Sequence, residues 1–376
     1  MTMARSRAML GVIGCLCLVA TACSNSSSGG GNGSPSASSS SSSDTIPAAV
    51  DALNKLLQRP ETLPSTVPIS KPIPKGKTID WLQCGISDCA ILTPPLKAAA
   101  ASLGWNVKVV DAGLTPESVK NAWDLAVRDH PDAVFASGFP ASIFKSELAQ
   151  LKAMNIPVID FAVHDKSGNG ITAVIQGDNT SYAIGVGLAD WVLAKKGKSA
   201  NTLLVTSSTF ANLPITVNGF KHEYNTLCPS CKVDTLDAPA TTFGTTLPGN
   251  VVTYLRSHPD VNYIAADEGA MSQGIPQAIK TAGMNIQMIT QYPNQTTAQY
   301  LKDGSVLAGI IMPQEIDAMW QMTDAAARYY AGMSTKPAEA PSPLWFVTPE
   351  TVSQISPPYS LIPDYPAKYK QLWGVS

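Results

Sequence analysis

The stretch that decides the fold, residues 78–161, contains four short apolar runs: TIDWLQ (78–83), NVKVVD (106–111), AVFA (133–136) and PVIDF (157–161). The segments between the runs have helical spacing. Val119, Trp123 and Val127, for example, recur at every fourth position and form one apolar stripe that a helix can bury on a sheet. This alternation predicts parallel strands joined by crossover helices.

The same alternation continues after a fifth apolar run at 171–175. The predicted strands of this second series are 202–206, 232–236, 261–265, 286–290 and 306–311. The helices between them are predicted at 214–227, 247–257, 275–282 and 296–302. A long final helix, with Met319, Met322 and Ala326 on one stripe, ends at Gly332. We therefore expect an α/β protein with two doubly wound parallel-sheet lobes.

The N-terminus has the features of an exported lipoprotein. Arg5 and Arg7 precede an apolar run that is too short for a membrane span, which predicts a signal peptide over residues 1–22. The run ends in VATAC, and the small residues before Cys23 resemble the lipobox of bacterial lipoproteins, which implies a lipid anchor on that thiol. An ordinary signal peptide with a chance cysteine is the alternative. Residues 23–44 are nearly all Ser and Gly and predict a flexible tether.

The remaining chain of about 330 residues is long enough for two domains. The formal net charge of −2 and the lack of a Lys/Arg cluster argue against a nucleic-acid partner. Residues 45–76 predict a short amphipathic helix and then a proline-rich segment that lies along the surface. No H-E-x-x-H motif, G-x-S-x-G motif or complete P-loop is present, so we expect no catalytic residue and no cofactor.

Four cysteines remain after the signal peptide and Cys23, and their spacing in an exported protein predicts the disulfides Cys84–Cys89 and Cys228–Cys231. A four-thiolate zinc site is an alternative that fits the spacing only loosely, and we expect no metal. A redox role for Cys228 and Cys231 is the other alternative. It would require a helix N-terminus, whereas this pair follows a predicted helix.

Several motifs occur in an order that resembles one known family: IPVI (156–159), GDN (177–179), GF (219–220), ADEGAMSQGI (266–275) and LKDGSVLAGI (301–310). Residues 77–347 resemble the type I periplasmic binding proteins, and more closely the ribose/galactose-like branch of ABC-transporter solute-binding lipoproteins. The resemblance implies two lobes joined by three crossing strands, with ligand in the cleft between them. The crossings would lie near 174–177, 312–314 and 336–340.

The resemblance also implies a layout for the two lobes. The N-terminal lobe would comprise residues 77–175 and 314–335, and the C-terminal lobe residues 176–313 and 340–350. Residues 351–376 would form a C-terminal strap over the surface.

Ligands of open α/β sheets bind beyond the carboxyl ends of the strands, so the loops there supply the candidate ligand-binding residues. These candidates are Ser87, Asp88, Phe139, His164, Asp165, Ser208, Asn212, Asp267, Glu268, Gln291, Tyr292 and Gln314. For Asp267 the alternative is a helix N-cap, and for Phe139 and Tyr292 it is core packing. For His164 and Asp165 the alternative is a solvent-facing loop.

The resemblance matches Asp267 and Gln314 to ligand-binding positions of the family. It also shows departures: Ala162-Val163 replaces an Asp-Arg pair, and Pro214 stands near an expected arginine. A pocket with fewer hydroxyl partners suits a ligand less hydroxylated than a hexose, because each unpaired buried polar atom costs about 1–3 kcal/mol.

Together these observations imply an extracytoplasmic lipoprotein, monomeric and anchored to the outer face of the cell membrane. It would capture a small organic solute, sugar-like or less hydroxylated, and deliver it to an ABC permease. The alternatives are a ligand-presenting sensor for a membrane receptor and an exported α/β hydrolase. The signal peptide and the absence of a helix-turn-helix argue against a DNA-binding regulator.

Overall fold

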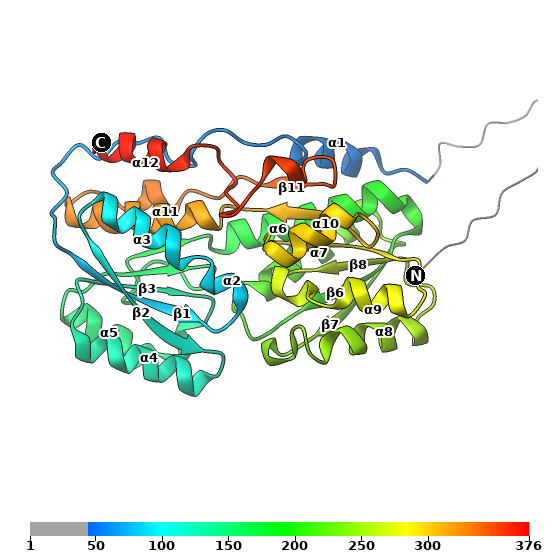
Figure 1. Ribbon diagram of the computed structural model, residues 1–376, viewed down its shortest axis with the longest axis horizontal. Coiled ribbons are helices and arrows are strands. Elements are labelled where there is room, and N and C mark those ends of the chain that lie inside the picture. Colours follow the sequence, from blue (N-terminus) through cyan, green and yellow to red (C-terminus); the bar gives the residue numbers. More distant parts are fainter. Residues whose placement is uncertain (1–43, 376) are drawn as a thin grey trace, which may run out of the picture. The chain divides into compact units, whose positions relative to one another are not determined.

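The computed structural model of the protein describes residues 44–375, apart from the side chain of Ser87. The predicted signal peptide, Cys23 and nearly all of the tether lie outside the described residues. The described chain contains two α/β sheets (Figure 1). Within this part of the chain, no helix is both long and apolar enough to span a bilayer.

The first sheet is entirely parallel and has the strand order β2-β1-β3-β4-β5. Its strands are β1 (Thr78–Cys84), β2 (Asn106–Gly113), β3 (Ala133–Ser137), β4 (Val158–Phe161) and β5 (Ala173–Ile175). Each of the five apolar runs forms one strand. Every residue of β3, β4 and β5 is buried, as expected for strands covered on both faces.

Helices cover both faces of the first sheet (Figure 1). They are α2 (Ser87–Ala90), α3 (Thr93–Ser102), α4 (Pro116–Asp129), α5 (Lys145–Ala153) and α11 (Ile316–Tyr330). Thr115 and Ser118 form a capping box that starts α4, and the helix ends at His130 in left-handed conformation. Of the predicted α4 stripe, Val119 and Trp123 are buried and Val127 is half-buried. The Trp123 ring stacks on Phe144 with centroids 3.9 Å apart. We call this sheet and its helices the N-terminal lobe.

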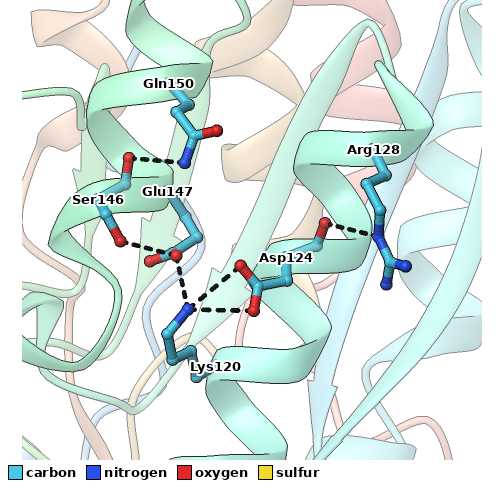
Figure 2. Close-up of polar contacts among 6 residues, drawn as sticks. All are labelled: Lys120, Asp124, Arg128, Ser146, Glu147 and Gln150. Carbon is cyan, nitrogen blue, oxygen red and sulfur yellow. Dashed lines mark hydrogen bonds and ion pairs between the residues drawn. The ribbon is translucent and has the colours of Figure 1, made fainter.

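An ion-pair network joins α4 to α5 (Figure 2). Lys120 Nζ lies 2.8 Å from Glu147 Oε1 and 3.0 Å from Asp124 Oδ2. The Glu147 side chain is only 3% exposed, and it also accepts a hydrogen bond of 2.7 Å from Ser146. Burial raises the pKa of Glu147, but the hydrogen bonds from Lys120 and Ser146 outweigh it, and the net shift is downward.

The second sheet has the order β11-β10-β9-β8-β6-β7. Its strands are β6 (Asn201–Thr206), β7 (Lys232–Asp237), β8 (Tyr263–Ala266), β9 (Gln287–Gln291), β10 (Leu307–Met312) and β11 (Trp345–Val347). Among these described strands only β11, at one edge, pairs antiparallel. The accompanying helices are α6 (Asp178–Lys196), α7 (Leu213–Leu227), α8 (Leu247–Ser257), α9 (Ile275–Thr281) and α10 (Gln295–Asp303). We call this unit the C-terminal lobe.

Helices α6 and α7 of the C-terminal lobe approach so closely that glycine is required at their contact. A Cβ on Gly185 would lie 1.9 Å from the carbonyl oxygen of Thr216, and one on Gly219 would lie 2.2 Å from that of Tyr182. Backbone meets backbone at this contact, so any side chain there would push the helices apart.

The chain passes between the two sheets three times, after β5, after β10 and before β11. These passages lie at or close to the three predicted crossings. The structure confirms the predicted fold class of two parallel-sheet α/β lobes.

The terminal segments pack on both lobes. Helix α1 (Pro47–Leu56) lies where a short amphipathic helix is predicted, and it contacts α6. The Arg59 guanidinium donates hydrogen bonds of 2.9 Å to the carbonyl oxygens of Gln354, Ser360 and Leu361. The N-terminal segment therefore holds the C-terminal one in place.

Residues 351–376, which were predicted to form a C-terminal strap over the surface, include helix α12 (Tyr365–Trp373). Trp373 stacks on Trp320 of α11 at 5.3 Å, and its Nε1 donates to Asp324 Oδ1 at 2.8 Å. The preceding prolines concealed the helix, although a proline in the first turn is compatible with one. Tertiary packing of the aromatic stripe stabilises it.

Candidate functional site

The carboxyl ends of strands from both sheets meet at a small cavity of about 40 Å³. From the N-terminal lobe it is lined by the ends of β1, β3 and β4 and by α2, and from the C-terminal lobe by the loops after β6, β8 and β9. The residue before α11 completes the wall. The cavity therefore lies where the strand-end rule places ligands in α/β sheets.

Four of the predicted residues line this cavity: Asp88, Asn212, Glu268 and Tyr292. Asp88 comes from α2, directly after β1, and the other three come from the C-terminal lobe. Both lobes thus contribute polar side chains to one small space. Ser87 is the first residue of α2, and its side chain lies outside what the structure describes.

The buried predicted residues Asp267, Gln291, Gln314 and Phe139 lie beside the cavity but do not line it. Asp267 accepts a hydrogen bond of 2.7 Å from Thr206, and its backbone oxygen accepts one from the Gln291 side chain. Asp267 is not the helix N-cap either, because Glu268 takes that position by accepting from the Gly269 amide.

Gln314 and Phe139 make other contacts. The Gln314 side chain is fully buried, and its backbone amide donates a hydrogen bond of 2.7 Å to the Ser342 hydroxyl. The Phe139 ring lies 5.8 Å from that of Phe210 and packs in the core.

The remaining three predicted residues lie elsewhere. Ser208 bonds through its hydroxyl and its amide to Asp237 at 2.8 and 2.7 Å. His164 is exposed and its Nδ1 lies 2.7 Å from Asp178 Oδ1, while Asp165 accepts from the Ala141 amide at 2.8 Å. These contacts hold loops in place, which agrees with the alternative of a solvent-facing loop for His164 and Asp165.

The structure adds lining residues outside the twelve candidates, above all Glu315, Phe161 and Phe210. Glu315 directly follows Gln314, the residue predicted at this crossing, so the signal was present but displaced by one position. Phe161 ends β4, and an aromatic residue at a strand end is usually core. Its burial is compatible with both roles, because it packs in the core and also borders the cavity.

Three carboxyl groups, those of Asp88, Glu268 and Glu315, meet at the cavity. Burial raises the pKa of Glu268 well above its usual value. The charge of Asp88, a hydrogen bond with the Asp88 carboxyl group and the charge of Glu315 raise it further. Burial, and then the charges of Asp88 and Asp317, raise the pKa of Glu315 in the same direction. Burial, and then the charges of Glu268, Glu315 and Asp88, raise the pKa of Tyr292.

Hydrogen bonds connect the two lobes around the cavity. The side-chain amide of Asn294 donates to Asp88 Oδ1 at 2.8 Å, and the backbone amide of Ala211 donates to the Gly138 carbonyl at 2.9 Å. The Tyr292 hydroxyl donates to Gln176 Oε1, in the crossing after β5, at 3.0 Å. Closely apposed lobes are needed to form the first two of these bonds.

The backbone is strained at the cavity. Ala162, Gln176 and Tyr292 have φ angles of 55°, 54° and 55°, in the left-handed region that non-glycine residues seldom occupy. Each directly follows a strand, and Ala162 and Tyr292 line the cavity. Strain of this kind collects at binding sites, where the surrounding structure holds it.

Both predicted disulfides are present. Cys84–Cys89 connects the end of β1 to α2, the helix that carries Asp88, and both cysteines line the cavity. Cys228–Cys231 closes the turn between α7 and β7. Across residues 44–375, no cluster of three or more His, Cys, Asp or Glu side chains is arranged to hold a metal ion.

Comparison with known proteins agrees with this architecture. A family model described as a periplasmic binding protein domain matches residues 91–334. An ABC sugar transporter subunit from Rhodobacter sphaeroides 2.4.1 has a similar structure, with 21% identity, a TM-score of 0.65, and coverage of 73% of this chain and 99% of its own. At these identities the likeness concerns the fold alone.

Two further similar structures hold small ligands. An ABC transporter solute binding protein from Agrobacterium vitis with bound allitol has 18% identity and a TM-score of 0.65, covering 74% of this chain and 98% of its own. A carbohydrate transporter solute binding protein from Agrobacterium radiobacter in complex with D-arabinose has 18% identity and a TM-score of 0.62, covering 74% and 96%. No curated protein matches the sequence.

Proposed function

Because the chain belongs to the periplasmic binding protein family, whose members bind solutes and are not enzymes, we propose that it is an extracytoplasmic solute-binding lipoprotein of an ABC importer. The observation that carries the proposal is the cavity at the strand ends of two lobes, with polar walls from both. A ligand that contacts both lobes favours the closed arrangement over the open one.

Hinge opening is required for entry of any ligand larger than a few atoms. The cavity of about 40 Å³ exceeds the roughly 10–15 Å³ that one water needs, so the closed lobes leave room for only a few waters. A sugar-sized solute would have to bind with the lobes apart and then hold them at a wider separation. The hydrogen bonds of Asn294 and Ala211 would break and re-form in each cycle.

The walls suit a small organic solute. Phe161 and Phe210 supply apolar surface, while carboxyl, amide and hydroxyl groups supply acceptors and donors. The bound allitol and D-arabinose of two similar structures support a sugar-like or polyol-like ligand here. The strained backbone at Ala162 and Tyr292 is consistent with walls that are held in a fixed position for binding.

Lipid anchoring is supported by the signal-like N-terminus and the small residues before Cys23. A tether of Ser and Gly would then hold the binding body clear of the membrane, where it can reach a permease. Replacing Cys23 with Ser should release the protein from membrane fractions into the medium. Retention of that variant in the membrane would contradict the anchor.

Binding without turnover is the test of the proposed function. We expect one ligand per chain in calorimetry of the purified mature protein against sugars, polyols and nucleosides, with a rise in melting temperature by mass action. Tyr292→Phe should weaken that binding, and Ser208→Ala, which lies outside the cavity, should not. Chemical conversion of a ligand would point to the hydrolase alternative. If the liganded protein bound the ectodomain of a membrane receptor and not a permease, the result would point to the sensor alternative.

A further inference from the structure

We propose that the physiological ligand carries a protonated amine, which is held between the carboxyl groups of Asp88, Glu268 and Glu315. The inference rests on the proposed binding function and specifies the chemical class of the ligand. It goes beyond a sugar or polyol, whose hydroxyl groups are neutral.

The three carboxyl groups reach the cavity from three separate parts of the chain. Asp88 comes from α2, Glu268 from the loop after β8, and Glu315 from the crossing before α11. Their exposed fractions are only 4%, 7% and 3%. The described residues that line the cavity include no Lys, Arg or His, so the wall provides no opposite charge.

The hydrogen bonds at the site leave an acceptor of Glu315 unused. Asp88 Oδ1 accepts from Asn294, and Glu268 Oε1 accepts from the Gly269 amide at 2.9 Å. Glu315 Oε2, by contrast, is buried without a hydrogen-bond partner among the described residues. A buried carboxyl oxygen without a donor is unfavourable, and on the cavity wall a ligand can supply that donor.

An ammonium group fits these acceptors better than a hydroxyl. It has three N–H donors and no acceptor, so it can contact several carboxylates at once. Hydrogen bonds between charged partners are roughly twice as strong as neutral ones, and the positive charge would also relieve the repulsion among the carboxylates. An anionic ligand would increase that repulsion. The rings of Phe161 and Phe210 leave apolar surface for the carbon skeleton of the ligand.

The surrounding charges predict how pH would affect binding. The ionisable groups that face Glu268 and Glu315 are Asp88, Asp267, Asp317 and Tyr292, and none is basic. Burial and these neighbours raise the pKa of Glu268 and Glu315, and a bound cation would lower it again. Binding of an amine should therefore release protons and tighten as pH rises, up to the pKa of the amine itself.

Matched pairs of probes test the inference. Calorimetry would compare glucosamine with glucose, ethanolamine with ethylene glycol, and 1,4-diaminobutane with 1,4-butanediol, at pH 6 and pH 8. At least one amine should bind tenfold or more tightly than its neutral partner. That amine should also bind more tightly at pH 8 than at pH 6. Proton release on binding should appear as a dependence of the measured binding enthalpy on the ionisation enthalpy of the buffer. The Glu315→Gln variant keeps the side-chain shape and should lose most of this preference. Asp303→Asn removes an exposed acid from α10 and should keep it.

Several outcomes would overturn the amine assignment. These are equal or tighter binding of the neutral partner in every pair, no binding of any amine, or an unchanged preference in a folded Glu315→Gln variant. The proposed function would survive any of these results if a neutral sugar or polyol bound. It would fail separately if no probe of either kind bound and the protein isolated from its host carried no small molecule in native mass spectrometry.

Discussion

Replacing Asn294 with Asp should favour the open arrangement of the lobes without unfolding either one. Asn294 has two separate roles. Its Oδ1 caps α10 by accepting from the Thr297 amide at 2.9 Å, and its Nδ2 donates to Asp88 Oδ1 at 2.8 Å across the lobes. Aspartate is as good an N-cap as asparagine, so the cap is retained. The donor is replaced by an acceptor that faces a carboxylate.

The expected magnitude follows from the contact that is lost. A hydrogen bond to a charged group contributes about 1.5–3 kcal/mol, and that amount would be removed from the closed arrangement. It corresponds to a shift of about 10- to 150-fold toward the open arrangement. Repulsion between the introduced carboxylate and Asp88 would add to it. Asn294→Ser is the matched control, because serine also caps helices but introduces no charge, so its shift should be smaller.

The distance between the lobes is the direct measurement. Spin labels at the exposed positions Lys152 and Lys302 should report a longer mean distance in Asn294→Asp than in the wild type, with Asn294→Ser between them. Acidification should partly reverse the Asn294→Asp effect alone, because a protonated carboxyl can donate to its neighbour. Identical distance distributions in all three proteins would refute the reasoning, as would a large loss of melting temperature in the serine control.

Three further predictions concern a docked helix, an ion pair and a close helix contact. Trp373→Ala should cost about 3–5 kcal/mol of unfolding free energy in urea denaturation if α12 is a docked helix, and under about 1 kcal/mol if it is a loose strap. The lowered pKa of Glu147 makes the folded wild-type protein more stable above pH 4.5, the usual pKa of the group, and this stability is lost as pH falls through the folded pKa. Lys120→Met removes the ion pair that lowers this pKa. The variant should therefore lose less unfolding free energy than the wild type on acidification. Gly185→Ala should lower the free energy of unfolding by about 1–3 kcal/mol or more, because its Cβ would meet the backbone of α7. Gly249→Ala is the control: a Cβ there meets nothing within 4 Å, so the free energy of unfolding should stay the same or rise.

The strands were predictable because buried parallel strands are continuous apolar runs. The run at 133–136, for example, lies within β3, in which every residue is buried. Helix α12 was not predictable in the same way, because its stripe of Tyr365, Tyr369 and Trp373 follows a proline-rich segment. Only contact with Trp320 of α11 makes this stripe a buried one.

The site was predictable as a region but not residue by residue. Neighbouring residues differ in role. Glu268 lines the cavity, whereas Asp267 bonds to Thr206 inside the C-terminal lobe. Glu315 lines the cavity, whereas Gln314 is buried outside its lining. The direction of a side chain in a loop depends on backbone angles such as the left-handed φ of Tyr292, which the residue type does not disclose.

By itself, the sequence determined the alternation of strands and helices, the two series, the edge of each sheet that borders the candidate site and the local disulfides. All of these depend on apolar periodicity or on short separations along the chain. The tertiary structure decided that Asp88, Glu268 and Glu315 share one cavity without a basic partner among its described lining residues. These residues are far apart in the sequence, and only the packing of one lobe against the other brings their charges together.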